Sequence, residues 1–64
     1  MIQINGIGYE KDKIVLKEFM EENKIQPTWV AVELNGEILP KSEYETTVLK
    51  SGDVVEILNF VGGG

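Results

Sequence analysis

The fold of this chain is decided by its last apolar run, Val54-Val55-Glu56-Ile57-Leu58-Asn59-Phe60-Val61. Side chains alternate between the two faces of a strand, so Val55 and Ile57 share one face. Val54, Leu58 and Phe60 share the other face. A strand that is apolar on both faces has the pattern of one buried within a sheet. The run therefore predicts a final strand over residues 54–61 that can lie inside a sheet.

Two Asn-Gly dipeptides predict two hairpins earlier in the chain, because both residues of such a turn need positive φ. The first joins strands expected at residues 2–4 and 7–11. The second joins strands expected at residues 29–34 and 37–39, where Pro40 ends the pairing because it has no N–H. In the first hairpin, the expected facing pairs are Ile4 with Ile7 and Ile2 with Tyr9.

Between the two hairpins, apolar residues recur at helical spacing. They are Val15, Leu16, Phe19 and Met20. Asp12 has the side chain of a helix N-cap, and Pro27 bounds the helix at its other end. We therefore expect an amphipathic helix of roughly three turns. Residues 41–44 resemble a helical turn, Val48 and Leu49 are expected to reach the core, and residues 51–53 form a turn before the last strand.

These elements predict an α+β domain, a mixed sheet of four to five strands with one main helix on one face, in the ubiquitin-like β-grasp arrangement. A single helix covers a single face of the sheet. One apolar face of the last strand should therefore stay exposed, either that of Val54, Leu58 and Phe60 or its opposite. Exposed apolar patches of this kind usually mark a protein interface.

The amino-acid composition excludes several classes of binding partner and of functional site. The chain has 64 residues, enough for one domain, and carries 6 basic and 11 acidic residues for a net charge of −5. This balance argues against nucleic acid and anionic membranes as partners. The absence of cysteine and histidine excludes disulfides and thiolate or imidazole metal ligands. Because no signal peptide or membrane-length apolar segment occurs, we expect a cytoplasmic protein.

The chain ends in Gly62-Gly63-Gly64, which we expect to be a flexible tail on a domain spanning residues 1–61. Fully extended, three residues reach about 10 Å, and without Cβ atoms they fit a narrow channel. The terminal carboxylate becomes electrophilic only after activation by ATP, and the resulting acyl adenylate can accept sulfur as a thiocarboxylate. No glycine-rich phosphate loop joins a strand to a helix, so we expect no bound nucleotide and no independent enzyme activity.

The sequence resembles the ThiS family, the sulfur carriers of thiamine biosynthesis, along essentially its whole length. The resemblance is clearest in a Leu-Asn-Gly-Glu hairpin followed by a Pro-Lys-Ser step, in the Gly-Asp turn, and in the glycine end. These segments are residues 30–44, 48–57 and 60–64. Residues 6–14 depart from the family, because the connection before the helix is shorter and more charged.

The resemblance implies that the last strand lies centrally, beside and parallel to the first, with Val55 and Ile57 facing the helix. Val54, Leu58 and Phe60, together with Trp29, then become the expected partner-binding residues. It further implies that an E1-like activating enzyme (a ThiF-like adenylyltransferase) adenylates Gly64 with ATP and magnesium. Gly62 and Gly63 would enter that enzyme's active site with it.

The resemblance also implies that sulfur comes ultimately from a cysteine desulfurase and is delivered to a ThiG-like thiazole synthase. Two alternatives remain open at this stage. One is a carrier related to the small subunit of molybdopterin synthase, and the other is a ubiquitin-like protein modifier or plain interaction module.

Overall fold

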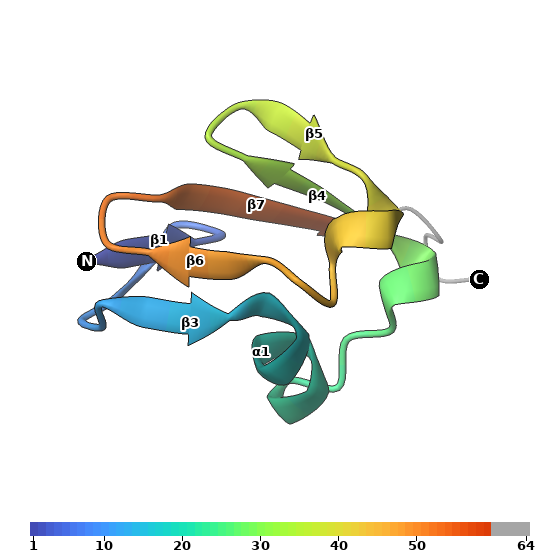
Figure 1. Cartoon of the computed structure of the whole chain (residues 1–64), viewed down its shortest axis with the longest axis horizontal. Coiled ribbons are helices and arrows are strands. Elements are labelled where there is room, and N and C mark those ends of the chain that lie inside the picture. The colour runs from blue at the N-terminus through green and yellow to red at the C-terminus, as the bar shows by residue number, and fades with distance from the viewer. Residues whose placement is uncertain (60–64) are drawn as a thin grey trace.

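A computed structural model describes residues 1–59 of the chain (Figure 1). Residues 60–64 lie outside this description, and so does the expected domain boundary after residue 61. The elements in chain order are β1 (Ile2–Ile4), β2 (Ile7–Tyr9), β3 (Lys13–Val15), α1 (Leu16–Glu22), the 3-10 turn η1 (Pro27–Trp29), β4 (Val30–Leu34), β5 (Glu37–Leu39), the 3-10 turn η2 (Lys41–Glu43), β6 (Val48–Lys50) and β7 (Val54–Asn59).

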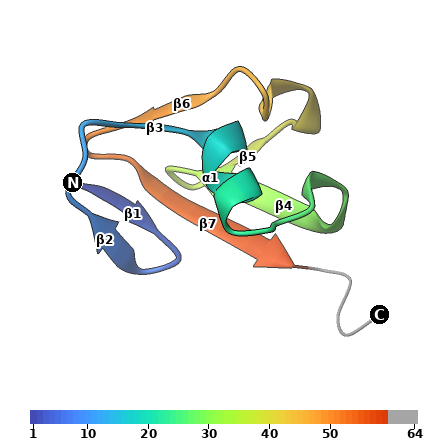
Figure 2. The ribbon, with the colours of Figure 1, turned by 90° about the horizontal axis from the view of Figure 1, so that it is seen from below.

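Five strands form one mixed sheet in the order β2-β1-β7-β4-β5. Strand β7 pairs in parallel with β1 and antiparallel with β4, and Figure 2 shows it running between them. This confirms the α+β class and the central position of the last strand. A strand with two neighbours pairs its backbone along both edges, so β7 is an interior strand of the sheet, as β1 and β4 are.

Both Asn-Gly turns adopt the geometry that their sequence predicts. Asn5 and Gly6 have φ of 52° and 81°, and Asn35 and Gly36 have φ of 53° and 86°. The expected register of the first hairpin is confirmed, with Ile4 opposite Ile7. Strand β2 is shorter than expected, however, because it ends at Tyr9 instead of Lys11.

The expected start of the helix is wrong. Helix α1 begins at Leu16, and no side chain caps its first turn. Asp12 lies before β3 and instead uses its backbone carbonyl, which accepts a hydrogen bond of 3.0 Å from Ser51 N–H. The helix is therefore 7 residues long and closer to two turns than three. It ends well before Pro27, through a left-handed residue, Lys24, at φ 57°.

The residues assigned to the helix start form a second, two-stranded sheet with β6. Lys13, Ile14 and Val15 pair antiparallel with Lys50, Leu49 and Val48. Sequence patterning missed this pair, because strands of three residues joined by contacts across the chain give no local signal. Ile14 and Leu49 belong to the same buried cluster as Leu16 and Val55, so this pair and α1 cover the same face of the large sheet.

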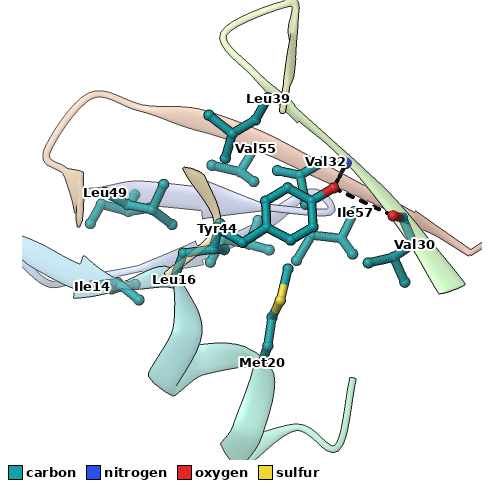
Figure 3. Close-up of a cluster of buried hydrophobic side chains, with 12 residues drawn as sticks. Ile14, Leu16, Met20, Val30, Val32, Leu39, Tyr44, Leu49, Val55 and Ile57 are labelled. Atoms are coloured by element: carbon teal, nitrogen blue, oxygen red, sulfur yellow. Dashed lines mark hydrogen bonds between the residues drawn. The ribbon is translucent and has the colours of Figure 1, made fainter. Parts of the chain in front are cut away.

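The core lies between that face and α1. Figure 3 shows side chains from α1, β4 and β7 meeting there, with Met20 directed toward Val30 and Ile57. Leu16 and Met20 are almost fully buried. Burial of each such side chain contributes about 1.5–3 kcal/mol, which makes this one face the source of most of the packing free energy.

Tyr44 completes the backbone pairing of β4 where β5 has ended. Its hydroxyl accepts a hydrogen bond of 3.2 Å from Val32 N–H and donates one of 3.4 Å to the Val30 carbonyl (Figure 3). Pro40 follows β5 directly and ends the strand. The buried hydroxyl therefore takes the place of the backbone partners that β5 would supply if it continued.

Candidate functional site

Strand β7 is held at its start by the turn between β4 and β5. Asn35 Oδ1 accepts a hydrogen bond of 2.8 Å from Val54 N–H, and Asn35 N–H donates one of 2.8 Å to the Val54 carbonyl. The Asn35 side chain thus pairs with the backbone of β7 just after β4 has ended, as a further strand residue would. This fixes the register between β4 and the first residue of β7.

The other Asn-Gly turn holds β7 nearer its end. Asn5 N–H donates a hydrogen bond of 2.9 Å to the Val55 carbonyl, and Asn5 Oδ1 accepts one of 2.7 Å from Ile57 N–H. Strand β1 has already ended at Ile4, so the asparagine side chain extends the pairing one step further. The two turns therefore position the strand that leads to the C-terminal residues.

Asp53 stands immediately before β7 and is buried. Burial raises the pKa of its carboxyl. Hydrogen bonds from Lys50 N–H and the Asn35 amide, together with the Lys50 charge, outweigh burial and bring the pKa below the ordinary value of 3.8. Asp53 therefore stays ionised at neutral pH and ties the turn before β7 to the neighbouring hairpin.

The two faces of β7 have different environments. Val55 and Ile57 are buried against the helix side, as the resemblance implied. Val54 and Leu58 point the other way and are 45% and 46% exposed. The opposite side of the sheet, which carries Val54 and Leu58, is called the free face below. Its exposure is a structural fact, whereas its use by a partner remains a prediction.

Trp29 belongs to η1 and not to the strand in which the sequence placed it. Its side chain is half exposed and lines a hollow of about 320 Å³ together with Lys24, Ile57 and Asn59. This hollow lies beside the last described residues of β7, whereas Val54 is the first residue of that strand. Trp29 is therefore a candidate for partner contacts near Asn59, the last described residue of β7.

The remaining expected site residues are Phe60, Gly62, Gly63 and Gly64. All four lie outside the described residues, so their roles stay predictions. Within residues 1–59, no group of three or more Asp or Glu side chains is close enough to hold a metal ion. No helix in that part of the chain is long and apolar enough to cross a membrane.

Comparison with known proteins shows which family this chain is similar to. The ThiS family model matches residues 2–64. The chain belongs to the ThiS family, the sulfur carrier proteins of thiamine biosynthesis. It is 36% identical to the sulfur carrier protein ThiS of Bacillus subtilis, over the full length of both chains.

A solved structure agrees in fold with this member of the ThiS family. The crystal structure of the thiamine biosynthesis protein ThiS from Geobacter metallireducens is similar with a TM-score of 0.73 and 36% identity, over 98% of this chain and 97% of that one. A further match is to part of a thiazole synthase of Paramagnetospirillum magneticum, 54% identical over 35 residues. These are 55% of this chain and 11% of that protein.

Sequence patterning missed the side chains that position β7. Asn5 and Asn35 were recognised only as turn residues, and Tyr44 only as part of a helical turn. The Asn-Gly dipeptides mark the turns, but the partners of both amides are on β7, 52 and 19 residues away. No local pattern reveals a bond of that span.

Proposed function

We propose that this chain carries sulfur for thiamine biosynthesis as a thiocarboxylate on Gly64, and that it acts as a co-substrate of partner enzymes and is not itself an enzyme. The observation that carries the proposal is the family match. It extends to residue 64 and therefore includes the glycine end on which the chemistry depends.

The chemistry begins with activation of the Gly64 carboxylate. An oxygen of this group attacks the α-phosphorus of ATP, supplied with magnesium by an E1-like adenylyltransferase, and pyrophosphate leaves. A persulfide on the sulfur donor then attacks the carbonyl carbon of the acyl adenylate, and the bond to AMP breaks. A thiol attacks the resulting acyl disulfide, which releases the thiocarboxylate on Gly64 and leaves the donor sulfur in a disulfide. The sulfur comes ultimately from a cysteine desulfurase. The carrier holds no cysteine of its own, so the terminal carbonyl is the place it offers for sulfur.

The free face supports the proposal as a docking surface. An enzyme that receives the glycine end must approach the strand that leads to it. The helix side of β7 is covered by α1 and the β3–β6 pair, which leaves the face of Val54 and Leu58. Apolar side chains at the centre of an interface supply much of its binding energy.

A thiazole synthase is the proposed acceptor of the sulfur. The support is the similarity of part of this chain to part of a protein that bears that name. The chain would then alternate between two enzymes, the adenylyltransferase that loads Gly64 and the synthase that unloads it.

The test is reconstitution with the adenylyltransferase encoded in the same genome, ATP, magnesium and a sulfur donor. Intact mass spectrometry should show one oxygen replaced by sulfur, located at residue 64 by fragmentation. The chain lacking Gly64 should show no change. An unchanged mass for the full chain, with an enzyme shown to be active on another carrier, would contradict the proposal.

A further inference from the structure

Two glutamates stand directly opposite each other on the free face. Glu33 on β4 is in register with Glu56 on β7. Both side chains point away from the core, since their neighbours Val32, Val55 and Ile57 point into it. Among residues 1–59, neither carboxylate has a hydrogen bond or an ion pair.

This arrangement costs stability in the isolated chain. Like charges directly opposite on neighbouring strands destabilise a sheet. The described part of the chain contains all 6 lysines, and none of them forms an ion pair with Glu33 or Glu56 to offset the repulsion. Within residues 1–59, the two negative charges therefore have no positive partner.

Apolar side chains surround the pair. Val54 and Leu58 precede and follow Glu56 on the same face of β7, at 45% and 46% exposure. Ile38 on β5 is in register with Glu33 and is 65% exposed. The free face therefore presents two carboxylates within an apolar rim, which is the complement of a cation carried on an apolar protein surface.

We propose that the activating enzyme places an arginine over Glu33 and Glu56 when it binds the free face. This rests on the proposed function, which supplies an enzyme that must approach β7. Neighbouring strands are about 4.8 Å apart, so one planar guanidinium with five donors can reach carboxylates on both. The apolar part of an arginine side chain then packs on the rim.

Arginine suits this site better than the other cations. A lysine ammonium is a compact, strongly hydrated charge that loses more on leaving water. A guanidinium is less strongly hydrated and forms paired hydrogen bonds to carboxylates. The bound arginine would also offset the repulsion between the two glutamates. Relief of this repulsion on binding adds to the affinity of the enzyme for the chain.

The test compares Glu33→Gln, Glu56→Gln and the double variant with Glu22→Gln. Glu22 is exposed at the end of α1, on the covered side of the sheet, and its substitution changes the net charge by the same amount as each single variant. Titration calorimetry with the adenylyltransferase of the same genome, without ATP, gives the affinity. Each single free-face variant should bind about tenfold more weakly, and Glu22→Gln should stay within about twofold.

Two further results are expected. The double variant should lose less than the sum of the two single losses, because both carboxylates bind one guanidinium. The melting temperature of the free-face variants should equal or exceed that of the original chain, since the repulsion is gone. Weaker binding together with unchanged or higher stability separates a contact from a folding defect.

An affinity of the double variant within about twofold of the original would overturn the inference. The proposed function would survive that result as long as the original chain still gains sulfur at Gly64. Failure of the original chain to bind or be loaded by the enzyme contradicts the proposed function, and the inference falls with it.

Discussion

The side-chain amide of Asn35 donates a hydrogen bond of 3.0 Å to Oδ1 of Asp53. The bond joins the turn between β4 and β5 to the turn that opens β7. Asp53 Oδ2 also accepts a hydrogen bond of 2.9 Å from Lys50 N–H, so one buried carboxylate connects three segments at the start of the central strand. The hydrogen bonds that hold the start of β7 therefore have the Asp53 carboxylate as their common acceptor.

Stability should therefore fall at acid pH. The pKa of Asp53 is lower in the folded chain than its ordinary value, so the unfolded chain takes up the proton first as pH falls. The contribution is complete above the ordinary pKa of 3.8 and is lost as pH falls through the folded pKa. Urea unfolding from pH 7 downward should show this loss, and Asp53→Asn should flatten the acid limb.

Asp12→Asn serves as the control for that experiment, since Asp12 is exposed and its carboxylate makes no hydrogen bond in the described part of the chain. It should leave the acid limb unchanged. An equal flattening in both variants would mean that Asp53 has no special part in the pH dependence.

Replacement of Asn5 by glycine should loosen the end of β7. Glycine keeps the positive φ of the turn but removes the acceptor for Ile57 N–H. We expect a loss of about 1 kcal/mol in the free energy of unfolding. Hydrogen exchange at the Ile57 amide should also become faster. The matched change Lys24→Gly, at φ 57°, should not destabilise the chain. Slow exchange at Ile57 in the Asn5 variant would show that the Asn5 side chain does not protect this amide.

The Tyr44 hydroxyl should contribute measurably to stability. Tyr44→Phe leaves the buried Val32 N–H without an acceptor, which costs about 1–3 kcal/mol. Tyr9→Phe is the control, because the Tyr9 hydroxyl makes no hydrogen bond within residues 1–59 and its ring contact with Phe19 is kept. Chemical denaturation of both variants gives the difference. Equal midpoints would contradict a role for the hydroxyl.

Charge on the two faces of β7 should have opposite consequences. Leu58→Asp should keep the fold, because the side chain is already 46% exposed, while the complex with the activating enzyme weakens by about 2 kcal/mol or more. Phe60→Asp should weaken the same complex. Ile57→Asp should unfold the chain, since it buries an unpaired charge. Binding of Leu58→Asp at the original affinity would exclude the free face as the docking surface.

Local sequence was sufficient for several parts of the fold. The Asn-Gly turns and the alternation in residues 30–34 depend on backbone conformation and on neighbours within a few positions, and both are confirmed. That one apolar face of the last strand stays exposed also followed from a simple argument, because one helix covers one face. The family resemblance, and not that argument, indicated that the exposed face is the one with Leu58. Asp12 misled the prediction of the helix start. Its side chain is of a type that caps helices, but the backbone before α1 is extended and the helix begins only at Leu16.

By itself, the sequence determined the two Asn-Gly turns, the strands that they join and a net charge of −5, because each depends on residue type or short-range spacing. Only the tertiary structure decided that Ile14 and Leu49 pair, that Asn5 and Asn35 reach β7, and that Glu33 faces Glu56. These relations join residues far apart in the chain. They arise only when the sheet sets its register, and that register is chosen by the packing of the whole core and not by any one segment.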